Sequence, residues 1–263
     1  MGPINQHLSW LPRAARVRGN ALALLWLHRG GWSLPLPRAL MRRERDTQLS
    51  ELMPAVMVIA LMVGVLMFVT LPSAIGSSYS AALVTLWPVW VIQGAPLAAA
   101  QVLALQRAPT LALELTQRHA SGEFDTLARM QSSPAAYPCV PLLAAHAVVT
   151  AAASFLLITL TLLVGMTSAF VLAVGDLGLT IDAVFNLVSP FDWLRSLITS
   201  MVLGLACSLA AMLYAWPGTQ TGRAGVDAHR LGLHTMMISS LTTIAAAVGL
   251  NWLISLAGFL KWW

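Results

Sequence analysis

Histidine, cysteine and lysine are the residue types in this 263-residue chain that could serve metal, thiol or phosphate chemistry. The six histidines are His7, His28, His119, His146, His229 and His234. None belongs to an HExxH pair, the spacing that places two zinc ligands on one helix face. The single lysine, Lys261, is not part of a glycine-rich loop that could bind nucleotide phosphates. We therefore expect no catalytic residue and no metal site, so any ATP hydrolysis belongs to a partner chain.

Cys139, Cys207 and His146 lie in or beside apolar segments of the sequence. Cys139 and Cys207 are isolated from each other, as small packing residues are, and they form no disulfide or metal framework. An ionisable residue such as His146 inside a membrane is a functional candidate. A neutral histidine that bonds to a neighbouring helix is the simpler interpretation, and both stay open. No acidic residue or polar cluster accompanies it, which disfavours an ion-coupled transporter or a membrane enzyme.

Apolar segments must position these residues. Hydrophobic residues make up 58% of the chain and charged residues 10%, against about 25% charged residues in soluble domains. A helix needs about 20 apolar residues to cross a bilayer. Five segments qualify: Leu52–Ile75, Ala81–Gln106, Val140–Gly175, Leu197–Trp216 and His234–Phe259. Their continuous apolarity excludes the alternating strands of a barrel, so we predict an all-α integral membrane protein.

Two of the segments have unusual features. Pro88 and Pro96 interrupt the second, and because proline removes a backbone donor, we expect a bent helix there. The third, Val140–Gly175, is too long for one perpendicular crossing. We expect a tilted helix followed by an apolar extension.

Basic residues are distributed unevenly around the segments. Eight arginines precede the first segment, and most of the others lie in the loops after the second and the fourth. The positive-inside rule then places the N-terminus in the cytoplasm and the C-terminus outside. Residues 1–50 form a cytoplasmic or interfacial segment, in which Leu8–His28 has the leucine, tryptophan and arginine mixture of a helix lying in the headgroup layer. A poorly ordered basic tail is the alternative.

The segment Thr110–Gln131 mixes apolar and charged residues. Gly122 interrupts its loosely helical pattern, so we expect a short helix pair or one helix with a break. A solvated loop is the alternative.

Short motifs accompany these elements in order. Ala95-Pro96-Leu97 lies in the second segment, and Glu114 follows Pro96 by eighteen residues. The later motifs are Pro134, then Pro190-Phe191-Asp192 with Ser200 and Gly204, then Gly225-Val226 and Ser239-Ser240.

This arrangement resembles the MlaE/YrbE-type permeases, the membrane subunits of ABC systems that move lipids together with MCE-domain proteins. That family has Gly-Pro-Val, a glutamate, a closing proline and a Pro-Leu-Asp run at matching places, and the resemblance covers residues 50–258. The chain departs from the family at Leu105-Gln106-Arg107-Ala108, where the family has Gly-Arg-Ala-Gly. Ser133 and Thr199 replace a family aspartate and lysine, so the chain resembles a divergent member.

The resemblance implies an interfacial N-terminal helix, a transmembrane permease domain over residues 51–263 and a cytoplasmic coupling segment between spans two and three. It implies a permease subunit for lipid, in particular phospholipid, moving between a bacterial inner membrane and the outer membrane. The implied partners are an ABC ATPase that holds ATP and Mg²⁺, a periplasmic MCE-domain protein and a second permease chain, identical or different. No cofactor on this chain and no nucleic acid are implied. The alternative is a non-transporting scaffold subunit or the degenerate half of a heterodimeric permease.

The resemblance also implies roles for individual residues. The candidate ATPase-coupling residues are Glu114, Arg118, Glu123, Phe124 and Asp125. The candidate lipid contacts are Met67, Phe68, Leu71 and Tyr79, at the outer end of the first span. Packing within the chain is an equal alternative for each lipid-contact residue.

Overall fold

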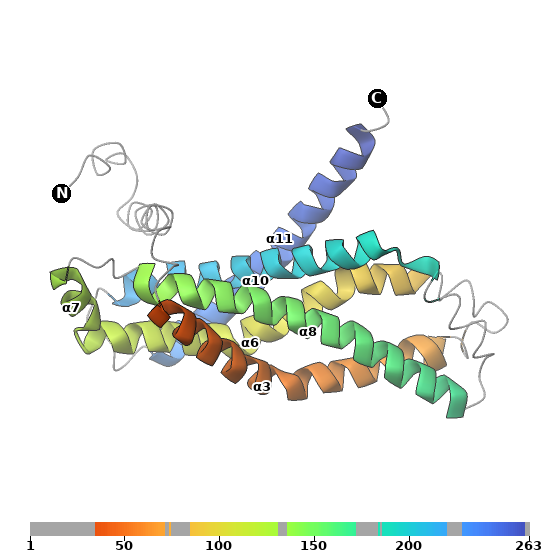
Figure 1. The fold of residues 1–263 in the computed structure, drawn as a ribbon, viewed down its shortest axis with the longest axis horizontal. Coiled ribbons are helices and arrows are strands. Elements are labelled where there is room, and N and C mark those ends of the chain that lie inside the picture. The colour runs from red at the N-terminus through yellow and green to blue at the C-terminus, as the bar shows by residue number, and fades with distance from the viewer. Residues whose placement is uncertain are drawn as a thin grey trace. The chain divides into compact units, whose positions relative to one another are not determined.

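The structure, a computed structural model, describes residues 35–71, 74, 85–130, 136–171, 184, 186–219 and 228–260. Within these ranges every regular element is helical (Figure 1). The elements are α3 (Pro35–Val65), the π-helix η2 (Leu66–Thr70), the π-helix η4 (Trp90–Gly94), α6 (Ala95–Ala120), α7 (Glu123–Arg129), α8 (Ala136–Val171), α10 (Pro190–Thr219) and α11 (Ala228–Leu260). The all-α prediction is confirmed, whereas the expected interfacial helix Leu8–His28 lies outside the described residues.

Five helical stretches in the described part of the chain are long and apolar enough to cross a membrane. They are Met41–Thr70, Thr85–Ala120, Cys139–Val171, Pro190–Ala215 and His229–Ser255. The predicted number of spans is therefore confirmed, but the bounds differ. The second stretch continues past Gln106 to Ala120 because the charged Arg107 is accommodated inside the helix instead of ending it. The third is one continuous helix over all its described residues, α8.

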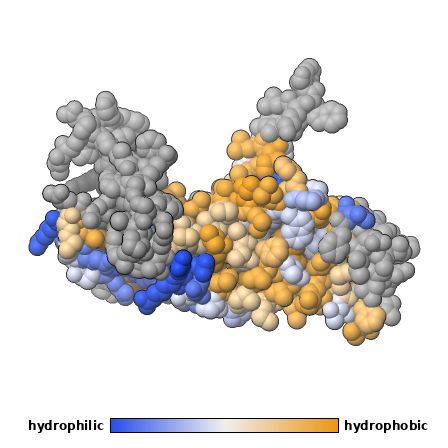
Figure 2. Space-filling view, viewed as in Figure 1, coloured by the Kyte–Doolittle hydropathy of each residue, from blue (hydrophilic) through white to orange (hydrophobic). Residues whose placement is uncertain are grey.

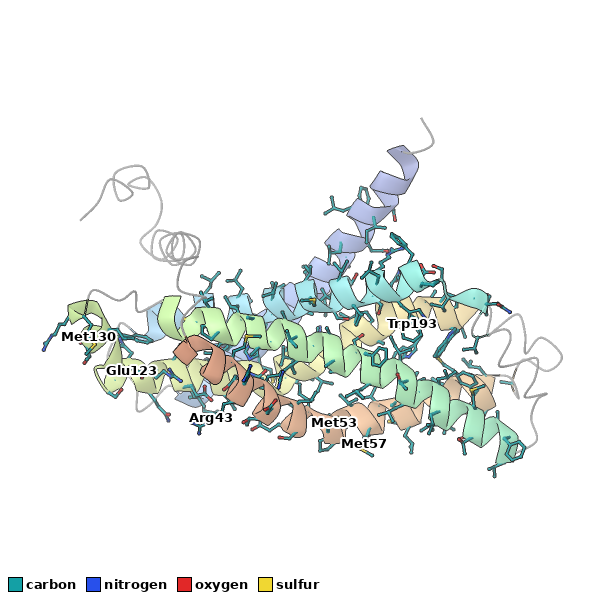
Figure 3. The ribbon with its side chains drawn as sticks, in the orientation of Figure 1. Arg43, Met53, Met57, Glu123, Met130 and Trp193 are labelled. Atoms are coloured by element: carbon teal, nitrogen blue, oxygen red, sulfur yellow. The ribbon has the colours of Figure 1, made fainter. Side chains whose placement is uncertain are left out.

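The outward faces of these helices are apolar, as a lipid environment requires. Only 11% of the most apolar part of α11 is buried within the chain. Large side chains such as Met57 on α3 and Leu241 on α11 are exposed, and Met57 points away from the helices around it (Figure 3). Hydrophobic residues accordingly cover much of the visible surface (Figure 2). A bilayer satisfies such surfaces, whereas water would not.

The chain divides into two compact units, each built from three stretches of sequence. The first contains residues 1–46, 104–146 and 205–242, and the second contains residues 47–103, 147–204 and 243–263. The core of the first unit joins small and apolar side chains from α6, α7, α8 and α10, including Leu111, Leu115, Phe124, Leu142 and Met212. This core holds the end of α6 and the short helix α7 in place.

Close helix packing organises the second unit. Gly64 on α3 lies so near α8 that an added Cβ would come within 2.8 Å of the Thr161 carbonyl oxygen. At Gly165 on α8 an added Cβ would overlap the Phe68 ring. Small residues allow helix backbones to approach closely in membranes, where van der Waals contact drives association. The two glycines therefore fix the contact between the first and third spans.

The expected irregularity in the second span takes the form of a π-helical turn. It lies between Pro88 and Pro96, where the Ala95 N–H donates to the Trp90 carbonyl five residues earlier. Pro96 has no N–H to donate, so the Val91 carbonyl needs another partner. The Ser196 hydroxyl of α10 supplies it, donating to the Val91 oxygen at 2.7 Å. A neighbouring helix thus satisfies the backbone group that proline leaves free, as the membrane interior demands.

Candidate functional site

The predicted coupling segment is a helix with a break. α6 continues to Ala120, and Ser121 and Gly122 form a turn before α7. Gly122 has φ 74°, a left-handed conformation that a residue with Cβ adopts only at a cost. The Gly122 N–H donates to the His119 carbonyl at 3.1 Å, which closes the end of α6. The prediction that Gly122 interrupts a helix in this segment is confirmed.

Phe124 anchors α7 to the rest of the first unit. Its side chain is only 6% exposed and belongs to the core that Leu111 and Leu115 of α6 also line. Its ring also lies against His119, with the ring centroids 5.9 Å apart. The structure therefore places Phe124 inside the chain's own core, where its immediate effect is to fix the position of α7.

Arg107 is the buried centre of a cluster of charged residues, whose two carboxylates are partly exposed. It is 8% exposed, and its Nη2 contacts the carboxylate of Glu44 on α3 and that of Glu114, the latter at 3.2 Å. Its Nη1 also lies 3.3 Å from the Thr110 hydroxyl. A charge removed from water is tolerated only when it is paired and hydrogen-bonded. Glu114, predicted as an ATPase contact, thus pairs with Arg107 within α6, and the contact between Arg107 and Glu44 joins α6 to α3.

Sequence reasoning did not single out Arg107 or Glu44 as site residues. The seven-residue separation of Arg107 and Glu114, nearly two helical turns, was a usable signal because such residues share a helix face. No comparable signal connects Glu44 with Arg107. These residues are 63 positions apart, and only the packing of α3 against α6 brings them together.

The remaining coupling candidates lie at the surface of this unit. Arg118 on α6 and Glu123 on α7 approach to 3.4 Å across the turn, and both are partly exposed. Ion pairs this accessible contribute little stability, typically about 0–1 kcal/mol. Asp125 is exposed on the first turn of α7, and the structure also places Glu123 on this helix (Figure 3). Asp125 is therefore the exposed acidic candidate, whereas the side chains of Glu123 and Glu114 are partly exposed, at 39% and 36%.

The lipid-contact candidates are mostly buried within the second unit. Met67 and Phe68 belong to η2 and are buried, and Leu71 is partly buried. The Phe68 ring packs edge-on against Trp87, with centroids 5.9 Å apart and an interplanar angle of 74°. Tyr79 lies outside the described residues. The geometry brings Met67 and Phe68 into the packing of the chain.

Comparison with protein families identifies the fold. The model of the family described as Permease MlaE matches residues 44–253. This chain belongs to the MlaE permease family. The match confirms the family predicted from the motifs. The matched range includes the charged residues Glu44, Arg107 and Glu114 and the whole of α7. Membership identifies a multi-pass membrane protein of a transport family. The comparison with curated proteins gave no match.

Proposed function

We propose that this MlaE-family chain is the membrane permease subunit of an ABC system that carries phospholipids between the inner and outer membranes of a bacterium. The family match over residues 44–253 is the observation that carries the proposal. The largely apolar side chains of its spans suit acyl chains, because each CH₂ group buried from water contributes about 0.8 kcal/mol.

The proposed assembly contains an ABC ATPase, an MCE-domain protein in the periplasm and a second permease chain. ATP and Mg²⁺ are bound by the ATPase. The N-terminus lies in the cytoplasm and the C-terminus in the periplasm, which follows from the excess of arginine before the first span and in the loops after the second and fourth. This orientation places α7 on the cytoplasmic side, within reach of the ATPase.

The coupling segment is proposed to receive movement from the ATPase through α7. Asp125 supplies an exposed acidic contact and Glu123 a partly exposed one, whereas Phe124 ties α7 to the core of the first unit. Glu114 acts inside the chain, because Arg107 links it to Glu44 on α3. A displacement of α7 would therefore reach α3 and α6 together.

Reconstituted transport activity tests the proposal. The chain is co-expressed with an ABC ATPase and an MCE-domain protein from the same bacterium, purified in mild detergent and placed in proteoliposomes. We expect the ATPase to co-purify and its hydrolysis rate to rise when phospholipid is present. Asp125→Lys should lower this stimulation at least fivefold, whereas Glu51→Lys, the same charge change on an exposed residue of α3, should preserve it.

Two results would contradict the proposal. A purified chain that brings down no ATPase would remove the transport assignment. A stable complex in which lipid neither stimulates hydrolysis nor moves between membranes would favour the non-transporting scaffold, or the degenerate half of a heterodimer.

A further inference from the structure

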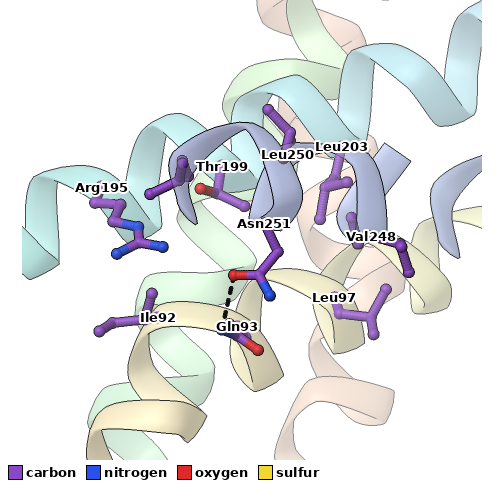
Figure 4. A pocket seen from close by; sticks show the side chains of 11 residues that line it. Ile92, Gln93, Leu97, Arg195, Thr199, Leu203, Val248, Leu250 and Asn251 are labelled. Atoms are coloured by element: carbon purple, nitrogen blue, oxygen red, sulfur yellow. Dashed lines mark hydrogen bonds between the residues drawn. The ribbon is translucent and has the colours of Figure 1, made fainter. Parts of the chain in front are cut away.

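A cavity in the second unit holds a basic side chain among apolar ones. Its volume is about 170 Å³, and its walls come from the second, fourth and fifth spans. The apolar lining includes Ile92, Leu97, Leu203, Leu250 and Ile254. Arg195 of α10 extends into the space beside the helix that carries Ile92 and Gln93 (Figure 4). A cationic group in an apolar cavity needs an anionic or strongly polar partner.

Arg195 lacks such a partner among the described residues. Its Nε is buried and makes no hydrogen bond, and the structure records no ion pair for its guanidinium in the described ranges. The nearest acidic residue along α10, Asp192, is already engaged as a helix cap. Its carboxylate accepts hydrogen bonds from the Ser189 N–H at 3.0 Å and the Ser189 hydroxyl at 2.8 Å. Asp192 thus completes a capping box at the start of α10.

The other polar groups of the cavity are neutral. Gln93 donates its side-chain N–H to the Asn251 side-chain oxygen at 3.1 Å, which joins η4 to α11 across the cavity (Figure 4). Thr199 lies one turn after Arg195 on α10 and lines the same space. None of the described residues that line the cavity is acidic, so Arg195 gives this lining a net positive charge.

Local structure holds Arg195 in this position. The next residue, Ser196, donates to the Val91 carbonyl that the proline at position 96 leaves without a backbone donor. This bond fixes α10 against the π-helical turn that also presents Gln93. π-Helical turns often occur at functional sites because the extra residue changes the direction of neighbouring side chains.

We infer that Arg195 binds the phosphate of a lipid headgroup in this cavity, an inference that rests on the proposed function in lipid transport. A guanidinium offers paired donors that match phosphate geometry, and Gln93, Asn251 and Thr199 provide further hydrogen-bonding groups. The volume is below the roughly 300 Å³ of pockets that enclose drug-sized ligands. The cavity therefore receives the phosphate and glycerol region, and the acyl chains lie along the apolar surface outside it.

Equilibrium binding of two fluorescent lipids to the full chain in neutral detergent tests this inference. The probes are phosphatidylglycerol and diacylglycerol with the same acyl chains, which differ in the phosphate-bearing headgroup. We expect the unmodified chain to bind phosphatidylglycerol about tenfold more tightly, the low end of what a charge-assisted hydrogen bond provides. Arg195→Gln should abolish the preference while leaving diacylglycerol binding unchanged, and Arg195→Lys should keep part of it. Arg129→Gln, which removes an exposed arginine of α7, should behave like the unmodified chain.

The variants are compared only when their size-exclusion profiles and helix content match those of the unmodified chain. A preference that survives in Arg195→Gln would overturn the inference and leave Arg195 as a side chain that extends to the membrane surface. Equal binding of both lipids by the unmodified chain would also overturn the phosphate site while preserving the proposed function. Binding of neither lipid would overturn both. Displacement of phosphatidylglycerol by equimolar inorganic phosphate would indicate a site for free anions and contradict the lipid assignment.

Discussion

Arg107 shows how a single charged residue is accommodated inside an apolar helix. Two carboxylates and a hydroxyl surround its guanidinium, and the carboxylates come from two helices. Removing one member of a buried ionic cluster leaves the others unpaired, which costs more than the cluster contributes when it is intact. The cluster therefore constrains how α3 and α6 can pack in the first unit.

Arg107→Gln should destabilise the chain. Glu44 and Glu114 would lose their shared cation, and because both carboxylates are partly exposed to solvent the expected loss is about 1–3 kcal/mol. Thermal unfolding in detergent should show a lower midpoint than for the unmodified chain. Arg45→Gln, which removes an exposed arginine paired only with its neighbour Asp46 in α3, should shift the midpoint little. Similar midpoints for both variants would contradict the importance of the Arg107 cluster.

A substitution at Gly165 tests the close packing of the first and third spans. An alanine Cβ there would overlap the Phe68 ring, which Trp87 confines on another side. Overpacking of this kind costs about 1–3 kcal/mol, so Gly165→Ala should lower the unfolding midpoint. Gly249→Ala is the matched control, because no atom of the described residues lies within 4 Å of the added Cβ. If the two substitutions have the same effect, close contact between the first and third spans is not what Gly165 provides.

Two irregular elements interrupt the helices where the sequence requires it. Gly122 ends α6 in a left-handed conformation, and α7 then begins with the acidic residues Glu123 and Asp125, which interact favourably with the positive end of a helix. In the second span, Pro96 follows a π-helical turn, and Ser196 of α10 satisfies the Val91 carbonyl. The first irregularity is local, whereas the second depends on a neighbouring helix.

Ser196→Ala should loosen the contact between α10 and the π-helical turn. The Val91 carbonyl would lose its side-chain donor in a buried place, at an expected cost of about 1–3 kcal/mol. Hydrogen exchange should become faster at amides of the π-helical turn, Trp90–Gly94, and the unfolding midpoint should fall. Ser255→Ala removes a hydroxyl that donates to the Asn251 carbonyl within α11, and it should leave both quantities unchanged. Unchanged exchange in Ser196→Ala would show that the turn is stable without the bond from α10.

At the scale of the whole molecule, the five spans and the uneven distribution of arginine predict a definite orientation. An odd number of crossings places the two ends of the chain on opposite sides. The described loops offer exposed reporter positions, because Met130 follows α7 and Asn186 precedes α10. The two positions are predicted to lie on opposite sides of the membrane.

Cysteine labelling can measure this orientation. Cys139 and Cys207 are buried and are first replaced by alanine. A membrane-impermeant maleimide added to spheroplasts should label Asn186→Cys but label Met130→Cys only after the cells are lysed. The reverse pattern would place α7 in the periplasm and remove it from contact with an ATPase.

Features that depend on a single segment were predictable from the amino-acid sequence. Continuous apolar runs predicted the five spans, because a chain inside lipid must satisfy its backbone within each helix. Gly122 predicted the helix break, and the ordered motifs predicted the MlaE family. The packing of the helices was needed to show that Phe124 is buried, that Glu44 and Glu114 both contact Arg107, and that Arg195 lies in a cavity with Gln93 and Asn251. These relations depend on how each helix is rotated and placed against its neighbours, which no local pattern in one helix specifies.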